Sequence, residues 1–268
     1  YGSWNKQLSC IITWHLPCVA RRGENDMRIS NRVSLVASGA LSMYLTHASD
    51  CNAYLVHGEK SCFLIDTGTG LDQETVIRAI EEELTAPLRY ILITHHHADH
   101  IGGLAGLQAH FGAKVFVPEA EFASIRDADE EVMGLAVARR SGYYPADYCV
   151  AACHPNATVR PGQTLELDGE RITVYSAAGH SLGGVCYLFT DGEMLFSGDL
   201  VMRGGLINLQ NIPGADLAAY AQSVLTLEQA PIRQLYPGHG CFCLKEGKSH
   251  IDVAAAQFRS LGVPKNFI

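Results

Sequence analysis

The chain has 268 residues, enough for one large domain or two small ones with a substantial core. A hydrophobic fraction of 47% beside 18% charged residues excludes a disordered chain. The formal net charge of −8 and the lack of any Lys/Arg run argue against a nucleic-acid partner, so we expect a small-molecule substrate.

Residues 1–26 differ from the rest of the chain. They contain an apolar run at 8–20, which is too short to span a bilayer and lacks a clean cleavage site. We expect a tag or upstream-derived extension at 1–26, with a removed signal peptide and secretion as the alternative, and a single domain at 27–268.

Nine scattered cysteines without a CxxC pair are typical of a reducing cytoplasm. We predict a cytoplasmic protein without a membrane segment and leave a homodimer open.

Extended patterns dominate the first part of the domain. Strands are predicted at 32–37, 53–57 and 61–66, the last two joined by a turn at 58–60. Asp72 is placed to cap a following helix, whose apolar face carries Val76, Ile77, Ile80 and Leu84. A buried strand at 89–94 runs into a histidine cluster and is followed by a helix at 103–111 and a strand at 114–118.

The stretch 119–156 is less regular. An amphipathic helix at 129–140 and the pair Tyr143-Tyr144 favour a helical, lid-like insertion that contacts substrate. An equally supported alternative is a pair of helices that packs against the rest of the domain without contacting substrate, with both tyrosines in the core.

The second part of the domain repeats the pattern of the first. A strand at 171–177, a strand pair within 183–199 turning at Asp191-Gly192, a helix at 216–229 and a strand at 233–238 precede a last helix at 249–260. We therefore predict an α/β fold, an αββα sandwich of two similar halves whose two mixed β-sheets pack face to face with helices on the outside.

The run Thr94-His95-His96-His97-Ala98-Asp99-His100 indicates a metal site. Alternate residues of an extended loop point the same way, so His95 and His97 can bind one ion while His96 points away. Asp99 and His100 begin the next helix and can turn towards a second ion. Three further candidates each follow an apolar strand and adjoin a glycine or another small residue, namely His180, Asp199 and His239.

This order of residues, HxHxDH and then a distant His, Asp and His, resembles the signature of the metallo-β-lactamase fold superfamily over about 33–240. The resemblance implies a first metal on His95, His97 and His180 and a second on Asp99, His100 and His239, with Asp199 bridging both. Asp66 of the "DTG" stretch would support the ligands by hydrogen bonding, as would Thr94 and His96. Asp66 read alone could be only a turn residue.

Such a site predicts a hydrolase. Two zinc ions, with iron or manganese as alternatives, would share a hydroxide that attacks an ester, lactone or thioester carbonyl. Asp199 would hold the bridge, and Asp99 would pass a proton to the leaving group.

Differences from the patterns of the individual subfamilies reduce the number of substrate classes to be considered. Asp199 is similar to the aspartate of glyoxalase II and the quorum-quenching lactonases, where most true β-lactamases carry cysteine or serine. Met202 stands where those lactonases have a tyrosine, and the C-terminal helical part with which glyoxalase II grips glutathione looks absent. The alternatives are a β-lactamase-like amidase, a mononuclear-iron persulfide dioxygenase-like oxygenase and a non-enzymatic descendant. Candidate substrate contacts are Tyr143, Tyr144, Met202 and Asn208.

Overall fold

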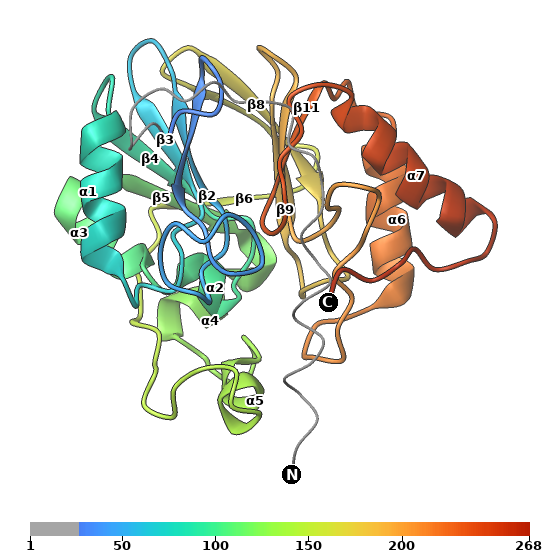
Figure 1. The fold of residues 1–268 in the computed structure, drawn as a ribbon, viewed down its shortest axis with the longest axis horizontal. Coiled ribbons are helices and arrows are strands. Elements are labelled where there is room, and N and C mark those ends of the chain that lie inside the picture. Colours follow the sequence, from blue (N-terminus) through green and yellow to red (C-terminus); the bar gives the residue numbers. More distant parts are fainter. Residues whose placement is uncertain (1–26) are drawn as a thin grey trace.

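Two β-sheets packed face to face form the centre of the protein, and helices cover their outer sides (Figure 1). The structure, a computed structural model, describes residues 27–268, so the predicted extension at 1–26 lies outside the described residues. In spatial order the first sheet contains β1 (Val33–Ala37), β2 (Ala53–His57), β3 (Cys62–Ile65), β4 (Leu88–Leu92), β5 (Lys114–Pro118) and β6 (Ala157–Val159). The second contains β11 (Gln234–Pro237), β10 (Met194–Gly198), β9 (Val185–Phe189), β8 (Glu170–Ser176) and β7 (Thr164–Leu167).

The helices lie on the outside of this sandwich. Figure 1 shows α1 (Gln73–Glu83) and α3 (Leu104–Phe111) beside the first sheet, and α6 (Leu217–Leu227) and α7 (Gly247–Arg259) beside the second. Four short elements lie in the connections of the first half: α2 (Ala98–Ile101) follows β4, and the 3₁₀ turn η1 (Glu119–Glu121), α4 (Phe122–Asp127) and α5 (Leu135–Arg140) lie between β5 and β6. No helix within 27–268 is long and apolar enough to cross a membrane.

The predicted similarity of the two halves is present in the strand pairing. In the first half β2 and β3 are antiparallel, and after α1 the chain returns as β4, parallel to β3. In the second half β9 and β10 are antiparallel, and after α6 the chain returns as β11, parallel to β10. The αββα sandwich with two mixed sheets is therefore confirmed.

Alternate residues of the strands enter different cores, because successive side chains of a strand point to opposite faces. On β2, Tyr54 and Val56 lie in the cluster between the sheets, whereas Leu55 packs with the α1 residues Val76 and Ile80. Strands buried on both faces explain why several read as unbroken apolar runs rather than alternating ones.

Three details differ from the sequence prediction. The strands β6 and β7 were not predicted, because three or four residues carry too short a pattern. The helix predicted at 129–140 is only α5, since Gly134 takes a left-handed conformation (φ 71°) and 129–134 forms turns before it. Asp72 precedes α1 as predicted, but its side chain makes no capping hydrogen bond.

Candidate metal centre

Strand direction brings the predicted ligands to one end of the sandwich. β8, β10 and β11 run parallel to one another, so their carboxyl ends share an edge, and the loops that carry His180, Asp199 and His239 start there. The loop after β4 carries His95 and His97 to the same place. A backbone hydrogen bond from Val185 N to Thr94 O (2.8 Å) joins the two halves beside it.

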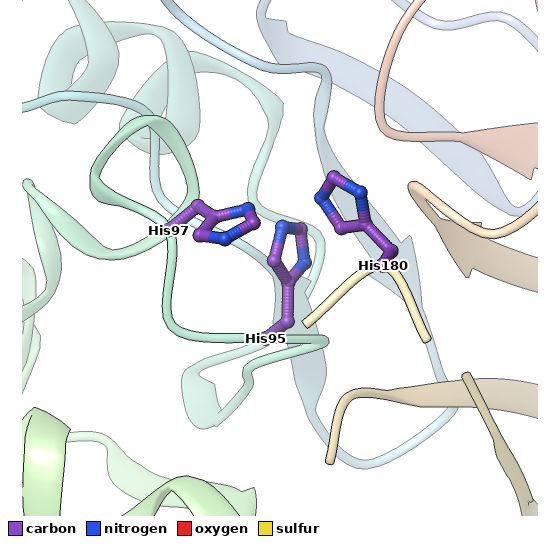
Figure 2. Close-up of side chains that lie close together, drawn as sticks. All are labelled: His95, His97 and His180. Carbon is purple, nitrogen blue, oxygen red and sulfur yellow. The ribbon is translucent and has the colours of Figure 1, made fainter. Parts of the chain in front are cut away.

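Three histidines form the first group (Figure 2). The ring centroids of His95 and His97 are 4.7 Å apart, those of His95 and His180 are 4.8 Å apart, and those of His97 and His180 are 4.6 Å apart. The Nε2 atom of each ring is buried without a hydrogen-bond partner in the protein. Buried nitrogens without partners are rare, and three that converge fit a metal ion.

Hydrogen bonds fix the tautomers of two of these rings, as metal-binding histidines generally require. His180 Nδ1 donates to the backbone oxygen of Asn208 (2.5 Å), and His95 Nδ1 lies 3.0 Å from Thr94 Oγ1. Burial, followed by the neighbouring imidazoles, holds the pKa of His95 and of His97 well below its usual value. Both rings are therefore neutral and offer a lone pair at Nε2.

Asp99, His100 and His239 form the second group, with ligand atoms that also lie within 4.8 Å of one another. His239 Nε2 is 3.1 Å from Asp99 Oδ2, and His100 Nε2 is 3.7 Å from the same oxygen. Asp99 and His100 are both in α2, as predicted.

Asp199 lies between the two groups. Its Oδ2 is 3.5 Å from His180 Nε2 and 3.4 Å from His239 Nε2, and its Oδ1 is 3.4 Å from His100 Nε2. One carboxylate thus faces ligands of both groups. Glycine is needed nearby, because a Cβ at Gly238 would collide with Asp199 Oδ1 and His100 Cε1.

Buried negative charge dominates the second group. Burial alone would lower the pKa of His239, but Asp199 and Asp99 raise it to about 9. Burial would likewise raise the pKa of Asp199, yet His239 and His100 hold it well below its usual value. The carboxylates therefore attract positive charge, which a divalent ion supplies.

Asp66 supports both groups and is more than a turn residue. Its Oδ1 accepts from Thr94 N (2.8 Å), and its Oδ2 accepts from Thr94 Oγ1 (2.8 Å) and His100 Nδ1 (2.8 Å). Because Thr94 Oγ1 donates to Asp66, it accepts from His95 Nδ1–H.

We expect Asp66→Asn to weaken metal binding about 10–100-fold, the usual cost of losing a partner of a ligand. The NH2 group of the asparagine would face either Thr94 N–H or the two donors Thr94 Oγ1 and His100 Nδ1, so at least one hydrogen bond is lost. Metal titration against a chromophoric chelator measures the resulting loss of affinity. Asp72→Asn, at the start of α1, is the control and should bind as the native protein does. Native affinity in Asp66→Asn would contradict the prediction.

The ring of His96 lies beside that of His97, with centroids 5.5 Å apart, but it does not join the candidate metal groups, in agreement with the alternation predicted for the loop. His96 is fully buried, and its Nδ1 is 2.8 Å from Ser124 Oγ, while its backbone N donates to Glu121 Oε2 (2.7 Å). No candidate metal group within 27–268 includes it.

The four predicted substrate contacts differ in how exposed their side chains are. Tyr143 is 50% exposed, and its phenol is close enough to Asp99 and Asp199 that, after burial, their charges raise its pKa. Tyr144, Met202 and Asn208 are buried, so for these three a direct substrate contact is not supported. Tyr144 packs in the core, and Asn208 Nδ2 donates to Asp199 Oδ2 (2.7 Å) instead.

Two neighbours of the candidate ligands, Glu121 and Cys51, were not predicted from the sequence, and Asn208 was predicted only as a substrate contact. Glu121 contacts two ligand loops, Asn208 orients Asp199, and Cys51 lies in a buried group with Asp66 and His100. Of these three residues, only Asn208 lies in a stretch that the sequence marks as functional, a glycine-rich segment, and that segment indicated the floor of a cleft rather than a partner of Asp199.

Comparison with known proteins agrees with this geometry. The family model described as the metallo-beta-lactamase superfamily matches residues 48–239. The chain belongs to the metallo-beta-lactamase superfamily. Acyl-coenzyme A thioesterase MBLAC2 of Gallus gallus is 30% identical over 212 residues, which cover 70% of this chain and 72% of that protein. A hydroxyacylglutathione hydrolase of Acidiphilium cryptum is 33% identical over 155 residues, or 56% of this chain and 51% of that protein.

Solved structures support the fold. A metallo-beta-lactamase family protein of Thermus thermophilus has a TM-score of 0.66 at 22% identity, over 87% of this chain and 81% of that one. As a member of this metal-dependent superfamily the chain is a hydrolase, and its buried, unpaired imidazole nitrogens fit the metal that the family uses.

Proposed function

We propose that this protein is a binuclear metallohydrolase that cleaves thioesters of small molecules, with carboxylic esters and lactones as related substrates. The observation that carries the proposal is the position of Asp199, a carboxylate that faces ligands of both metal groups. The thioesterase and the hydroxyacylglutathione hydrolase among its relatives support the substrate class.

The first ion would be held by His95, His97 and His180, and the second by Asp99, His100 and His239, with Asp199 between them. Zinc suits this set of nitrogen and oxygen ligands, as do iron and manganese. When bound, two divalent ions supply a hydroxide nucleophile near neutral pH and polarise the substrate carbonyl.

The remaining work falls to the protein's own side chains. Asp199 is kept ionised by His239 and His100, and Asn208 Nδ2 fixes its orientation. Asp99 lies at the edge of the second group, and although burial would raise its pKa, His100 and His239 lower it, so it is a carboxylate. It can accept the proton that the attacking water loses and then give that proton to the leaving group. A thiol, with a pKa of about 8.5, leaves more readily than an alcohol, so a thioester needs less help at the leaving group than an ester or a lactone does.

A substrate screen of the purified, zinc-loaded protein tests this proposal. The panel contains an acyl-coenzyme A, a glutathione thioester, a lactone, an aryl ester and a cephalosporin, with elemental analysis of the metal. We expect thioesters to be cleaved with the highest kcat/KM and two zinc ions per chain, and activity to disappear with a chelator. Preferred cephalosporin cleavage would favour the amidase instead. One iron per chain with O2 consumption would favour the oxygenase.

Tyr143 is proposed to contact the substrate from the segment between α5 and β6. We expect Tyr143→Ala to lower kcat/KM about tenfold, mainly through KM, because a half-exposed aromatic ring near Asp99 offers binding area rather than chemistry. Tyr175→Ala, on the helix-covered face of β8, is the control and should leave KM unchanged. An unchanged KM in Tyr143→Ala would contradict the contact.

A reducing compartment is proposed for the protein. All seven cysteines within 27–268 are free, which supports the cytoplasmic prediction.

A further inference from the structure

Glu121 is a buried carboxylate whose partners are all hydrogen-bond donors from elsewhere in the fold. It ends η1, and its side chain is fully buried. Its Oε1 accepts from Ser181 Oγ (2.6 Å) and Gly183 N (2.9 Å), and its Oε2 accepts from His96 N (2.7 Å). No ion pair within the described part of the chain joins it to a Lys or Arg.

Burying a carboxylate without a cation is costly unless several donors reach it. An ionised carboxylate only accepts, and donors to it make shorter and stronger bonds than neutral pairs do. The three bonds to Glu121 meet that requirement, and two of the three donors are backbone N–H groups, which fix the loop itself.

The donors belong to both loops that carry the first metal group. His96 lies between His95 and His97 in the first half, and Ser181 and Gly183 follow His180 in the second half. One side chain therefore ties together the two halves at the point where the three histidine rings converge. No donor to Glu121 comes from α2 or from the loop of His239.

The ring of His96 adds a second tie to the same segment. Ser124 Oγ donates to Glu121 O (2.9 Å), so it accepts from His96 Nδ1–H at 2.8 Å. The start of α4 and the loop of 95–97 are thereby held in one arrangement, by backbone and side chain together.

We propose that Glu121 is a positioning residue that sets the spacing of His95, His97 and His180 and so the affinity of the first metal ion. The inference rests on the proposed function only in taking these three histidines as metal ligands. It assigns to Glu121 no contact with substrate.

Glu121→Gln tests it with little change in shape. Whichever way the amide lies, its NH2 group faces either His96 N–H or the donors of Ser181 and Gly183. At least one of the three hydrogen bonds to this side chain is therefore lost, and no cavity is created. Glu119→Gln is the matched control, because Glu119 lies in the same turn but forms an exposed ion pair with Arg160. Ser181→Ala, which removes one donor, is a second variant in case Glu121→Gln does not fold.

Metal binding is the readout, measured by chelator competition, elemental analysis after dialysis and the absorption spectrum of the Co2+-loaded protein. We expect Glu121→Gln to bind the first ion about 10–100-fold more weakly, to retain one ion instead of two, and to show an altered Co2+ spectrum. Ser181→Ala should shift the same way by less, and Glu119→Gln should match the native protein.

Native affinity and spectrum in Glu121→Gln, or an equal loss of both ions, would overturn the inference. These measurements need no substrate. If the native protein binds two ions but cleaves no thioester, the proposed function fails while the metal data still decide the role of Glu121.

Discussion

Replacing Asp199 with alanine is expected to abolish hydrolysis and to remove at least one of the two metal ions. Asp199 faces His180 of one group and His100 and His239 of the other, so its loss removes a ligand from both. It also removes the negative charge that raises the pKa of His239, leaving a site with fewer acceptors for a cation. We expect kcat/KM to fall at least about 10³-fold, as when a unit of catalytic machinery is broken.

Elemental analysis and thioester hydrolysis on the same preparation measure both effects. Asp191→Ala, at the turn between β9 and β10, is the control and should keep two ions and native turnover. Asn208→Ala should lie between them, because it leaves the carboxylate in place but removes the bond that orients it. An Asp199→Ala protein that keeps both ions and most of its rate would show that Asp199 is not the bridge.

Two adjacent histidines should give opposite results. We expect His97→Ala to lose the first metal ion and to lower kcat/KM about 10³-fold or more, because the unpaired Nε2 of His97 is one of three that converge. His96→Ala should keep two ions and reduce turnover only a few-fold. Its backbone N–H still reaches Glu121, and the ring contacts that are lost, with Ser124 and with the side of the His97 ring, involve no metal ligand atom.

His96→Ala should instead lower the stability of the fold. Removing a buried, hydrogen-bonded ring leaves a cavity and takes away the donor to Ser124 Oγ, a cost of about 2–4 kcal/mol in the free energy of unfolding. Chemical denaturation of the metal-loaded protein measures this cost. Equal metal loss in the two variants would mean that the cluster binds in another register.

The sequence by itself predicted the layering, which the structure confirms, and a candidate ligand set, which the structure brings together at one end of the sandwich. The five candidates at 95–100 could be sorted because their geometry is local: alternate residues of the extended part share a side, and α2 begins at Ala98 and carries Asp99 and His100. The bounds of the long strands and helices agree with the prediction to within two residues, since their apolar patterns are long enough to fix the period. The β-hairpin recognised in each half of the sequence likewise predicted that the two halves share one topology.

Only the tertiary structure decided which residues meet across the sandwich. Glu121 is 25 residues from His96 and 60 from Ser181 in the chain, and an acidic residue in the stretch "PEAEFAS" reads as surface. Asn208 was predicted to contact substrate, and Tyr144 to lie either in a lid or in the core, and packing buries both. A sequence does not show which side of a loop faces the core. Local patterns fix what a segment forms and which side chains share a face. The burial of a carboxylate against two distant loops depends on where both halves come together, which no local pattern records.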